Sequence, residues 1–268
     1  MTRSHLAIAL VVLAAVLMLV PLLWVLALSL KANSELMTDT ASVFNGRFTL
    51  DNYRNLFGNG NVFRWIGNSL IVSLGMTAGV LVLTSLAGYG FEMFKSKWRD
   101  RIYSLVLLTL MVPFAALMIP LFIMMGKAGL INTHLAVVLP SIGSAFIVFY
   151  FRQCTKAFPS ELRDAAKVDG LKEWQIFLFI YVPVMRSTYA AAFIIVFMTA
   201  WNNYLWPLIV LQSNETKTIT LVVSSLASAY YPDYGVVMVG TILATLPTLA
   251  VFFFMQRQFV QGMLGSVK

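Results

Sequence analysis

The sequence predicts an all-α membrane protein with six transmembrane helices, and two observations carry this prediction. The chain is 59% hydrophobic and 11% charged, whereas a soluble domain carries about 25% charged residues. Six apolar stretches approach or exceed the roughly 20 residues that cross a bilayer, and none contains Asp, Glu, Lys or Arg. They are residues 6–30, 65–91, 102–125, 135–151, 189–211 and 235–255.

The first stretch, residues 6–30, is expected to be a retained helix rather than a cleaved signal peptide. Its apolar run is longer than the roughly 7–15 residues usual in a signal-peptide core. No small-residue cleavage site leads from it into a soluble domain. Residues 1–268 are therefore expected to form a single transmembrane domain.

The distribution of Lys and Arg predicts that both termini are cytoplasmic. Basic residues collect in cytoplasmic loops, and thirteen of the nineteen lie in the two termini and in the segments 92–101 and 152–188. The loops 31–64, 126–134 and 212–234 then face outward. The net charge of +8 reflects this bias, so we expect contact with membrane lipid and no nucleic-acid partner.

Two features of the spans bear on transport. Six of the nine prolines lie inside them, at Pro21, Pro113, Pro120, Pro140, Pro207 and Pro247. Proline interrupts helical hydrogen bonding, and transporters use broken helices around a central path, although packing kinks are an equally ordinary explanation. In the fifth span, Trp201, Asn202 and Asn203 are candidates to line a substrate path, or else to form bonds between helices.

Several chemistries are absent from the sequence. It contains no G-x-x-x-x-G-K-[ST] phosphate loop, no H-E-x-x-H and no G-x-S-x-G, which are motifs of nucleotide, zinc and hydrolase sites. Its one cysteine and two histidines show no ligand spacing. We therefore expect no catalytic residue, metal site or cofactor in this chain, and any energy source must lie on a partner.

The densest charge lies between the fourth and fifth spans, in residues 161–183. Ser160 is expected to cap a short helix, on which Leu162, Ala165 and Ala166 form a thin apolar ridge. Gly170 suits a left-handed helix stop. The pattern fits either a docking element or an amphipathic loop on the membrane surface.

A second helix is expected to begin near Lys172 and to end or kink at Pro183. It places Trp174, Phe177, Leu178 and Tyr181 at the i, i+3, i+4 and i+7 spacing of one apolar face.

This segment resembles the EAA loop of ABC-importer permeases, which reads E-A-A, three residues, Gly, nine residues and I-x-L-P. The chain has Asp164-Ala165-Ala166, Gly170, and then Ile180, Val182 and Pro183 at the same spacing. Further similarity to maltose-type permease subunits lies in "NSLIVS", "MIPLF", "AWNNYLWPLIV" and the tail "QRQFVQGMLGSVK". It extends from the first helix to the last residue.

The resemblance implies a type I ABC-importer permease fold in a bacterial inner membrane. It implies a MalF-like second permease, two copies of an ATPase that carries ATP and Mg, and an extracytoplasmic sugar-binding protein. Coupling to the ATPase would fall to Glu161, Asp164, Ala165, Ala166, Gly170 and Pro183. The loop 212–234 would contact the binding protein, and the C-terminal tail would reach the ATPase pair.

Two departures and two alternatives remain. Asp164 replaces the Glu of the motif and Val182 replaces its Leu, and the shorter Asp164 side chain would pair less closely with a basic partner, with Glu161 able to assist. A self-contained secondary carrier or channel is the alternative function, but it predicts an ionisable residue within a span. A membrane-embedded enzyme lacks a nucleophile or base at any span edge.

Overall fold

The computed structural model describes residues 2–38, 47–58, 61–230 and 232–264. Every regular element in these ranges is helical, apart from an isolated bridge between Lys31 and Phe48. The chain divides into two compact units. One comprises residues 1–67 with 217–247, and the other comprises 68–216 with 248–268. The all-α prediction is confirmed, whereas the expectation of a single domain over 1–268 stays a prediction.

The first unit contains α1 (Thr2–Ser29), α2 (Asn33–Thr38), α3 (Asp51–Gly58), α14 (Ile219–Ala227) and the first part of α15 (Tyr234–Leu264). Asn52 of α3 is buried and its Nδ2 donates to the carbonyls of Ser29 and Lys31, at 2.8 and 2.7 Å. Gly235 leaves room for this side chain, because a Cβ there would overlap the Asn52 amide. One amide thereby fixes α3 against the end of α1.

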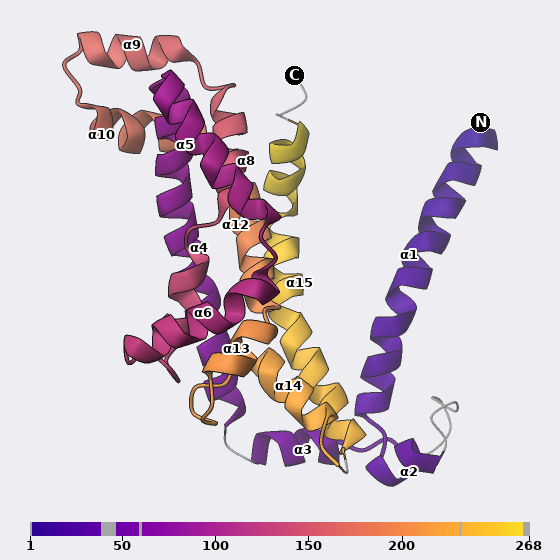
Figure 1. Cartoon of the computed structure of the whole chain (residues 1–268). Coiled ribbons are helices and arrows are strands. Elements are labelled where there is room, and N and C mark those ends of the chain that lie inside the picture. The colour runs from indigo at the N-terminus through magenta and orange to yellow at the C-terminus, as the bar shows by residue number, and fades with distance from the viewer. Residues whose placement is uncertain (1, 39–46, 59–60, 231, 265–268) are drawn as a thin grey trace. The chain divides into compact units, whose positions relative to one another are not determined.

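The second unit contains the remaining helices, many of them short (Figure 1). They are α4 (Val62–Met93), of which residues 68–93 belong here, α5 (Lys97–Leu108), α6 (Phe114–Lys127), α7 (His134–Val138), α8 (Ala145–Thr155), α9 (Ser160–Val168), α10 (Glu173–Ile176), α11 (Val182–Val184), α12 (Arg186–Trp201) and α13 (Leu205–Val210). Two 3-10 turns, η1 (Thr109–Met111) and η2 (Leu139–Ser141), and a π-helix, η3 (Phe177–Tyr181), link some of them.

The core of the second unit joins α4, α8 and α12. Val80 from α4, Phe151 from α8 and Ala192 from α12 are all buried in one cluster. Gly88 lets α4 and α8 approach, because a Cβ there would lie 2.6 Å from Cβ of Phe151. Small residues commonly permit such close contact between membrane helices.

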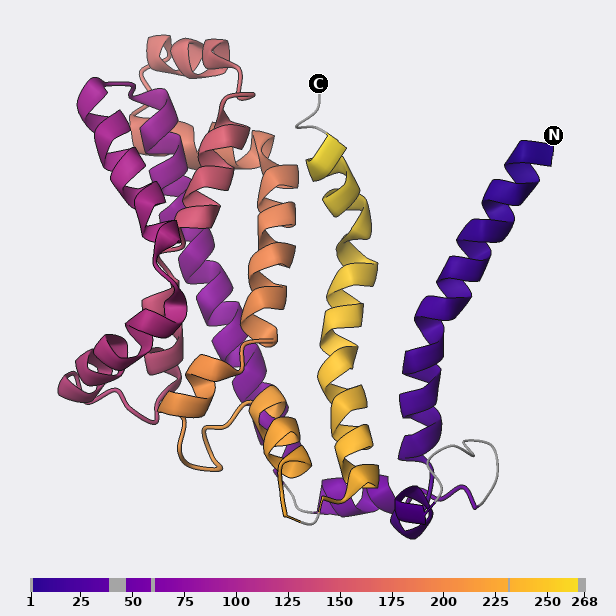
Figure 2. The same ribbon diagram turned by 45° about the vertical axis from the view of Figure 1, so that its right-hand side comes forward.

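Three helices, α1, α4 and α15, are long and apolar enough to cross a membrane without a break. Three further bent pairs would bring the number to six if each pair forms one span. The predicted span 102–125 is not one continuous helix. The chain leaves the helix at Val112, which is extended at φ −85° and ψ 116°, and α6 runs at 100° to the preceding segment (Figure 1, Figure 2). Pro113 causes this break, because the residue before a proline is pushed out of helical geometry.

The other predicted spans differ in similar ways. The span 135–151 bends by 47° between η2 and α8, next to Pro140. The helix of the span 189–211 ends at Trp201 and resumes at Leu205. Pro21, Pro120 and Pro247 instead lie inside helices that continue past them. Pro207 lies inside α13, after that break. The predicted interruption therefore occurs at Pro113 and next to Pro140 rather than at every proline.

Candidate functional site

The α9 helix ends in a tight turn built around Gly170. Gly170 has φ +81°, a left-handed conformation that costs other residues about 1–2 kcal/mol. Its N–H donates to Lys167 O, and the N–H of Leu171 donates to Ala166 O, both at 3.0 Å. This pair of bonds is the Schellman arrangement, so the predicted stop is confirmed. At the other end, α9 begins at Ser160 with Pro159 as its N-cap, so the prediction that Ser160 is the cap was wrong by one residue.

Glu173, the first residue of α10, holds α9 in place. It accepts hydrogen bonds from Arg163 through both carboxylate oxygens, and Lys167 Nζ lies 2.9 Å from Oε1. Tyr89 of α4 donates to Oε2 at 3.0 Å. Burial opposes the ionised form of Glu173, but the hydrogen bonds from Arg163, Lys167 and Tyr89 outweigh it, so the pKa of Glu173 lies below its ordinary value. One carboxylate thereby joins α4, α9 and α10.

Aromatic side chains pack around Tyr89, which donates to this carboxylate. Tyr89 packs edge-on against Phe177 and Tyr181, with ring centroids 5.3 and 4.8 Å apart. Phe158 also packs on Tyr181, whose hydroxyl lies 2.6 Å from Thr155 Oγ1. These rings belong to one buried cluster. The segment from α9 to α11 is therefore tied to α4 and α8 by packing as well as by charge.

The Arg163 guanidinium has a second contact at the end of α4. It lies 4.9 Å from the centre of the Phe94 ring, and the guanidinium of Arg99 lies 5.0 Å from the same ring. Cations are attracted to an aromatic face at such distances. In both views α9 lies beyond the end of α4 at which α5 begins (Figure 1, Figure 2).

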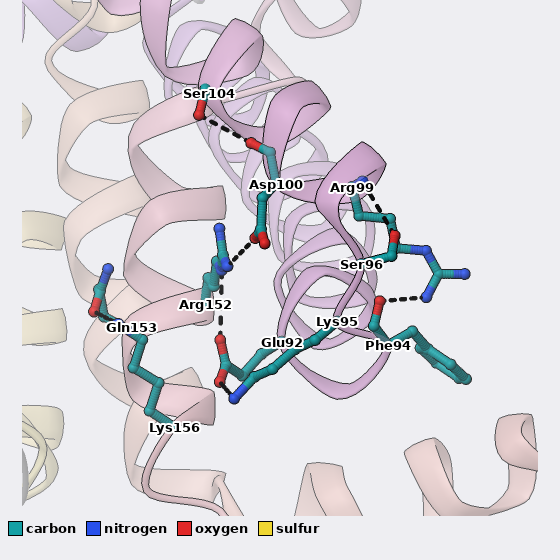
Figure 3. A network of polar contacts seen from close by, with 10 residues as sticks. All are labelled: Glu92, Phe94, Lys95, Ser96, Arg99, Asp100, Ser104, Arg152, Gln153 and Lys156. Carbon is teal, nitrogen blue, oxygen red and sulfur yellow. Dashed lines mark hydrogen bonds and ion pairs between the residues drawn. The ribbon is translucent and has the colours of Figure 1, made fainter.

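A second ionic network fixes that end of α4 to α5 and α8 (Figure 3). Arg152 of α8 pairs with Asp100 of α5 at 2.6 Å and with Glu92 of α4 at 3.4 Å, and Lys95 pairs with Glu92 at 2.8 Å. The Arg152 guanidinium also lies 4.0 Å from the centre of the Tyr103 ring. Glu92 is buried, and a buried carboxylate of this kind is stable only when it is paired.

The solvent-exposed surface of α9, opposite Glu173, makes none of these contacts. Glu161 and Asp164 are exposed and make no hydrogen bond or ion pair with any residue in the part of the chain that the structure describes. Ala165 is exposed, and Val168 keeps 88% of its surface accessible. Ala166 instead is buried. Because both basic residues of α9 are bound to Glu173, this surface carries unpaired negative charge.

The predicted apolar face of the second helix is divided in the structure. Phe177 and Tyr181 are buried, but Trp174 and Leu178 are 57% and 49% exposed. The cause is the π-helix: the N–H of Val182 donates to Phe177 O, five residues back, so each turn holds more residues than in an α-helix. Of the four residues predicted to form one apolar face, only Phe177 and Tyr181 pack into the buried cluster. Pro183, exposed in α11, follows directly.

Loop 212–234 contains the short helix α14. Residues 212–216 are bound to Asn132, which has φ +63°. Asn132 Oδ1 accepts from the N–H groups of Gln212 and Ser213 and from Thr216 Oγ1, at 2.9, 3.0 and 2.7 Å. Its own N–H donates to Val210 O. Sequence reasoning did not single out Asn132, although asparagine is among the few residues that tolerate this conformation.

The three residues predicted to line a substrate path differ in burial and in their contacts. Trp201 is buried, with its ring stacked on Phe197. Asn202 is exposed, and its Nδ2 donates back to Met198 O at 2.8 Å. Asn203 is partly exposed in the break that follows α12. Their role in a substrate path stays a prediction, as do the coupling roles of Glu161, Asp164, Ala165, Ala166, Gly170 and Pro183.

Comparison with known proteins identifies the family. The model for the family described as binding-protein-dependent transport system inner membrane component matches residues 81–265. This chain belongs to that family. The matched region contains α9, Glu173 and both ionic networks. The chain is therefore a membrane component of a transport system, and its predicted resemblance to importer permeases is confirmed.

Individual relatives agree with the family. The lactose transport system permease protein LacG of Rhizobium radiobacter is 67% identical over 256 residues, covering 96% of this chain and 93% of that protein. The arabinooligosaccharides transport system permease protein AraQ of Bacillus subtilis (strain 168) is 38% identical over 258 residues, covering 95% and 92%.

A solved structure confirms the fold. The crystal structure of a bacterial ABC transporter involved in the import of the acidic polysaccharide alginate contains a chain that matches with a TM-score of 0.82. The match covers 96% of each chain at 17% identity. At that identity it shows the fold alone, which is that of an ABC-importer permease.

Proposed function

We propose that this chain is a permease subunit of an ATP-driven, binding-protein-dependent importer of a neutral oligosaccharide, with lactose as the first substrate to test. Family membership and the permease fold support transport. The similarity to a lactose permease over nearly the whole chain supports the substrate class. The subunit is proposed to have six spans in a bacterial inner membrane, with both termini cytoplasmic.

Two features of α9 support the coupling role: its exposed surface carries unpaired acidic residues, and its basic residues fix the helix to Glu173. Glu161 and Asp164 face outward without partners in the described chain, whereas Arg163 and Lys167 are bound to Glu173. A basic groove on a partner would complement this surface. We place one ATPase subunit there, with Ala165 permitting close approach and Gly170 setting the orientation of the helix.

Through the contacts of Glu173, a movement of the docked α9 would reach the membrane-spanning helices. Since Glu173 joins α9 to α10 and to Tyr89 of α4, a displacement of α9 would be transmitted to α4 and, through the π-helix and Pro183, to α12. Closure of an ATPase dimer would then tilt these spans. ATP and Mg belong to the ATPase, and this chain has no catalytic role.

The remaining partners follow from the proposed assembly. A MalF-like second permease completes the translocation path, and an extracytoplasmic sugar-binding protein contacts loop 212–234. Trp201, Asn202 and Asn203 remain candidates for that path. The C-terminal tail, residues 256–268, is proposed to contact the ATPase pair. Its first part is the end of α15, and residues 265–268 lie outside the described residues.

The test is reconstitution of this chain with its second permease, its ATPase and its binding protein. Lactose is expected to enter proteoliposomes only when all four components and ATP are present, and binding protein loaded with lactose is expected to stimulate phosphate release. Uptake by this chain alone, driven by an ion gradient, would instead establish the alternative of a secondary carrier or channel.

A further inference from the structure

A half-open cavity of about 250 Å3 lies in the second unit, between α4, α12 and the turn that leads into α8. Its walls include Met76 and Val80 of α4 and Val196 of α12, which belong to the buried core. Every residue that lines it is uncharged. It is distinct from Trp201, Asn202 and Asn203, none of which lines it.

The break between η2 and α8 borders this cavity. Residues 142–144 are not helical, and the two helices they join are bent by 47°. On one side the turn touches α4, where a Cβ on Gly79 would lie 2.7 Å from Cγ2 of Ile142. On the other side the turn presents Ser141 and Ser144 to the cavity. In membrane proteins, such non-helical backbone is tolerated where it is enclosed by protein or lines a polar cavity.

Three of the residues that line the cavity carry a hydroxyl group, and each hydroxyl group keeps unused bonding capacity. Thr199 Oγ1 donates to Ile195 O at 2.8 Å, and Ser141 Oγ donates to Val137 O at 3.3 Å, so both oxygens can still accept. Ser144 Oγ accepts from the N–H of Ile147 at 3.4 Å, so its hydrogen can still be donated. A hydroxyl group has one hydrogen to donate and two lone pairs to accept with. The cavity therefore offers two acceptors and one donor.

The rest of the lining is apolar and includes an aromatic ring. Phe146 keeps 51% of its surface accessible and lines the cavity beside Met76 and Val196. Apolar walls with a few placed polar groups are typical of small-molecule sites. An ionic ligand would need a countercharge in such surroundings, and the lining supplies none. A neutral ligand with both hydroxyl groups and C–H faces matches this lining.

We infer that this cavity is a subsite of the translocation path that binds one neutral sugar ring through Ser141, Ser144 and Thr199, with the ring packed against Phe146. The inference rests on the proposed function and assigns this permease subunit its own contact with the substrate. The volume lies just under the roughly 300–1,000 Å3 of sites that enclose a whole ligand, which fits one ring of an oligosaccharide rather than the complete molecule.

The test compares variants in the complete reconstituted transporter, supplied with saturating binding protein loaded with radiolabelled lactose. Thr199→Val and Ser141→Ala each remove one hydroxyl with little change in shape. Thr84→Val is the matched control, because Thr84 donates to the carbonyl four residues back, as Thr199 does, but does not line the cavity. Thr199→Ser keeps the hydroxyl and serves as the rescue. Ser144 is left intact because it also caps α8.

Lactose uptake and phosphate release are measured together. One lost hydrogen bond corresponds to about 2- to 10-fold in binding. Each single variant is expected to lower uptake by about that factor. The double variant, Ser141→Ala with Thr199→Val, is expected to lower it by about the product of the two factors, roughly 4- to 100-fold. Phosphate release is expected to stay within about twofold of wild type, since α9 is unchanged. Thr84→Val and Thr199→Ser are expected to transport like wild type.

The possible failures are distinguishable. If the wild-type complex transports lactose and the double variant transports it equally well, the subsite is overturned and the proposed function stands. If the double variant loses the second permease during purification, the cavity is a subunit contact and the subsite is likewise overturned. If the assembled wild-type complex takes up neither lactose nor arabino-oligosaccharides, the proposed function fails, and the inference fails with it.

Discussion

The loop that contains α9 and the loop that contains residues 212–216 are both fixed by one polar side chain, but by different chemistry. Glu173 holds α9 through Arg163 and Lys167, which are ionic contacts. Asn132 holds residues 212–216 through neutral hydrogen bonds to two backbone N–H groups and one hydroxyl. Salt and acid weaken the first kind of contact and barely affect the second. The α9 loop and residues 212–216 are therefore expected to respond differently to salt and pH.

The largest expected effect is that of Gly170→Val on transport. Gly170 and Gly129 both have positive φ, and neither has an atom within 4 Å of an added Cβ. Valine at either position therefore strains the backbone without a steric clash. We expect Gly170→Val to lower the rate of sugar uptake more than 10-fold by misorienting α9. Gly129→Val, the matched control, is expected to keep at least half of the wild-type uptake rate. Uptake and membrane insertion are measured in parallel, and near-normal uptake by Gly170→Val would remove the coupling role of α9.

Glu173→Gln is expected to have the next largest effect. The amide keeps the shape but loses the charge that pairs with Arg163 and Lys167. We expect uptake to fall about 3- to 10-fold and hydrogen exchange to increase across residues 160–172. Exchange in residues 212–216 should be unchanged. Equal exchange in α9 of variant and wild type would contradict the anchoring role of Glu173.

The pH dependence of α9 protection follows from the same carboxylate. The folded-state pKa of Glu173 is lowered, so its contribution is complete above the unfolded pKa and is lost as pH falls through the folded pKa. We expect exchange in 160–172, corrected for the intrinsic rate, to rise as the pH drops below about 4 in wild type. In Glu173→Gln this rise should be absent, and a persisting rise would assign it to another group.

Asn132→Ala should have a smaller effect on transport. The substitution removes three accepted hydrogen bonds and places alanine at φ +63°. We expect increased exchange in 212–216 that does not depend on salt between about 50 and 500 mM, and uptake within about threefold of wild type. A strong salt dependence of that exchange would contradict the neutral character of this loop.

The sequence predicted those features that depend on local chemistry. Gly170 was predicted because few residues adopt a left-handed helix stop, and the start of the second helix near Lys172 followed from the same turn. The apolar stretches predicted where helices lie, although not where they break. The chain bends by 100° at Pro113, but Pro120 lies inside a continuing helix, and the sequence alone does not distinguish these two prolines.

The sequence did not predict features that depend on distant partners. The role of Glu173 requires Tyr89, 84 positions earlier, and Asn132 requires residues 80 or more positions later. Ser141 of η2 and Thr199 of α12, 58 positions apart in the sequence, line the same cavity. The exposure of Trp174 and Leu178 follows from a π-helix that the α-helical periodicity does not reveal.

The central claim is that α9 docks on the ATPase, and crosslinking from α9 tests it most directly. In a Cys154→Ser background, single cysteines replace Ala165 on α9 or Asn214 in the segment 212–216, both of which are exposed. In the assembled transporter, we predict that Ala165→Cys crosslinks to the ATPase and Asn214→Cys does not, but reaches the binding protein instead. Absence of any crosslink from Ala165→Cys to the ATPase, in nucleotide-free and ATP-trapped states alike, would contradict the account.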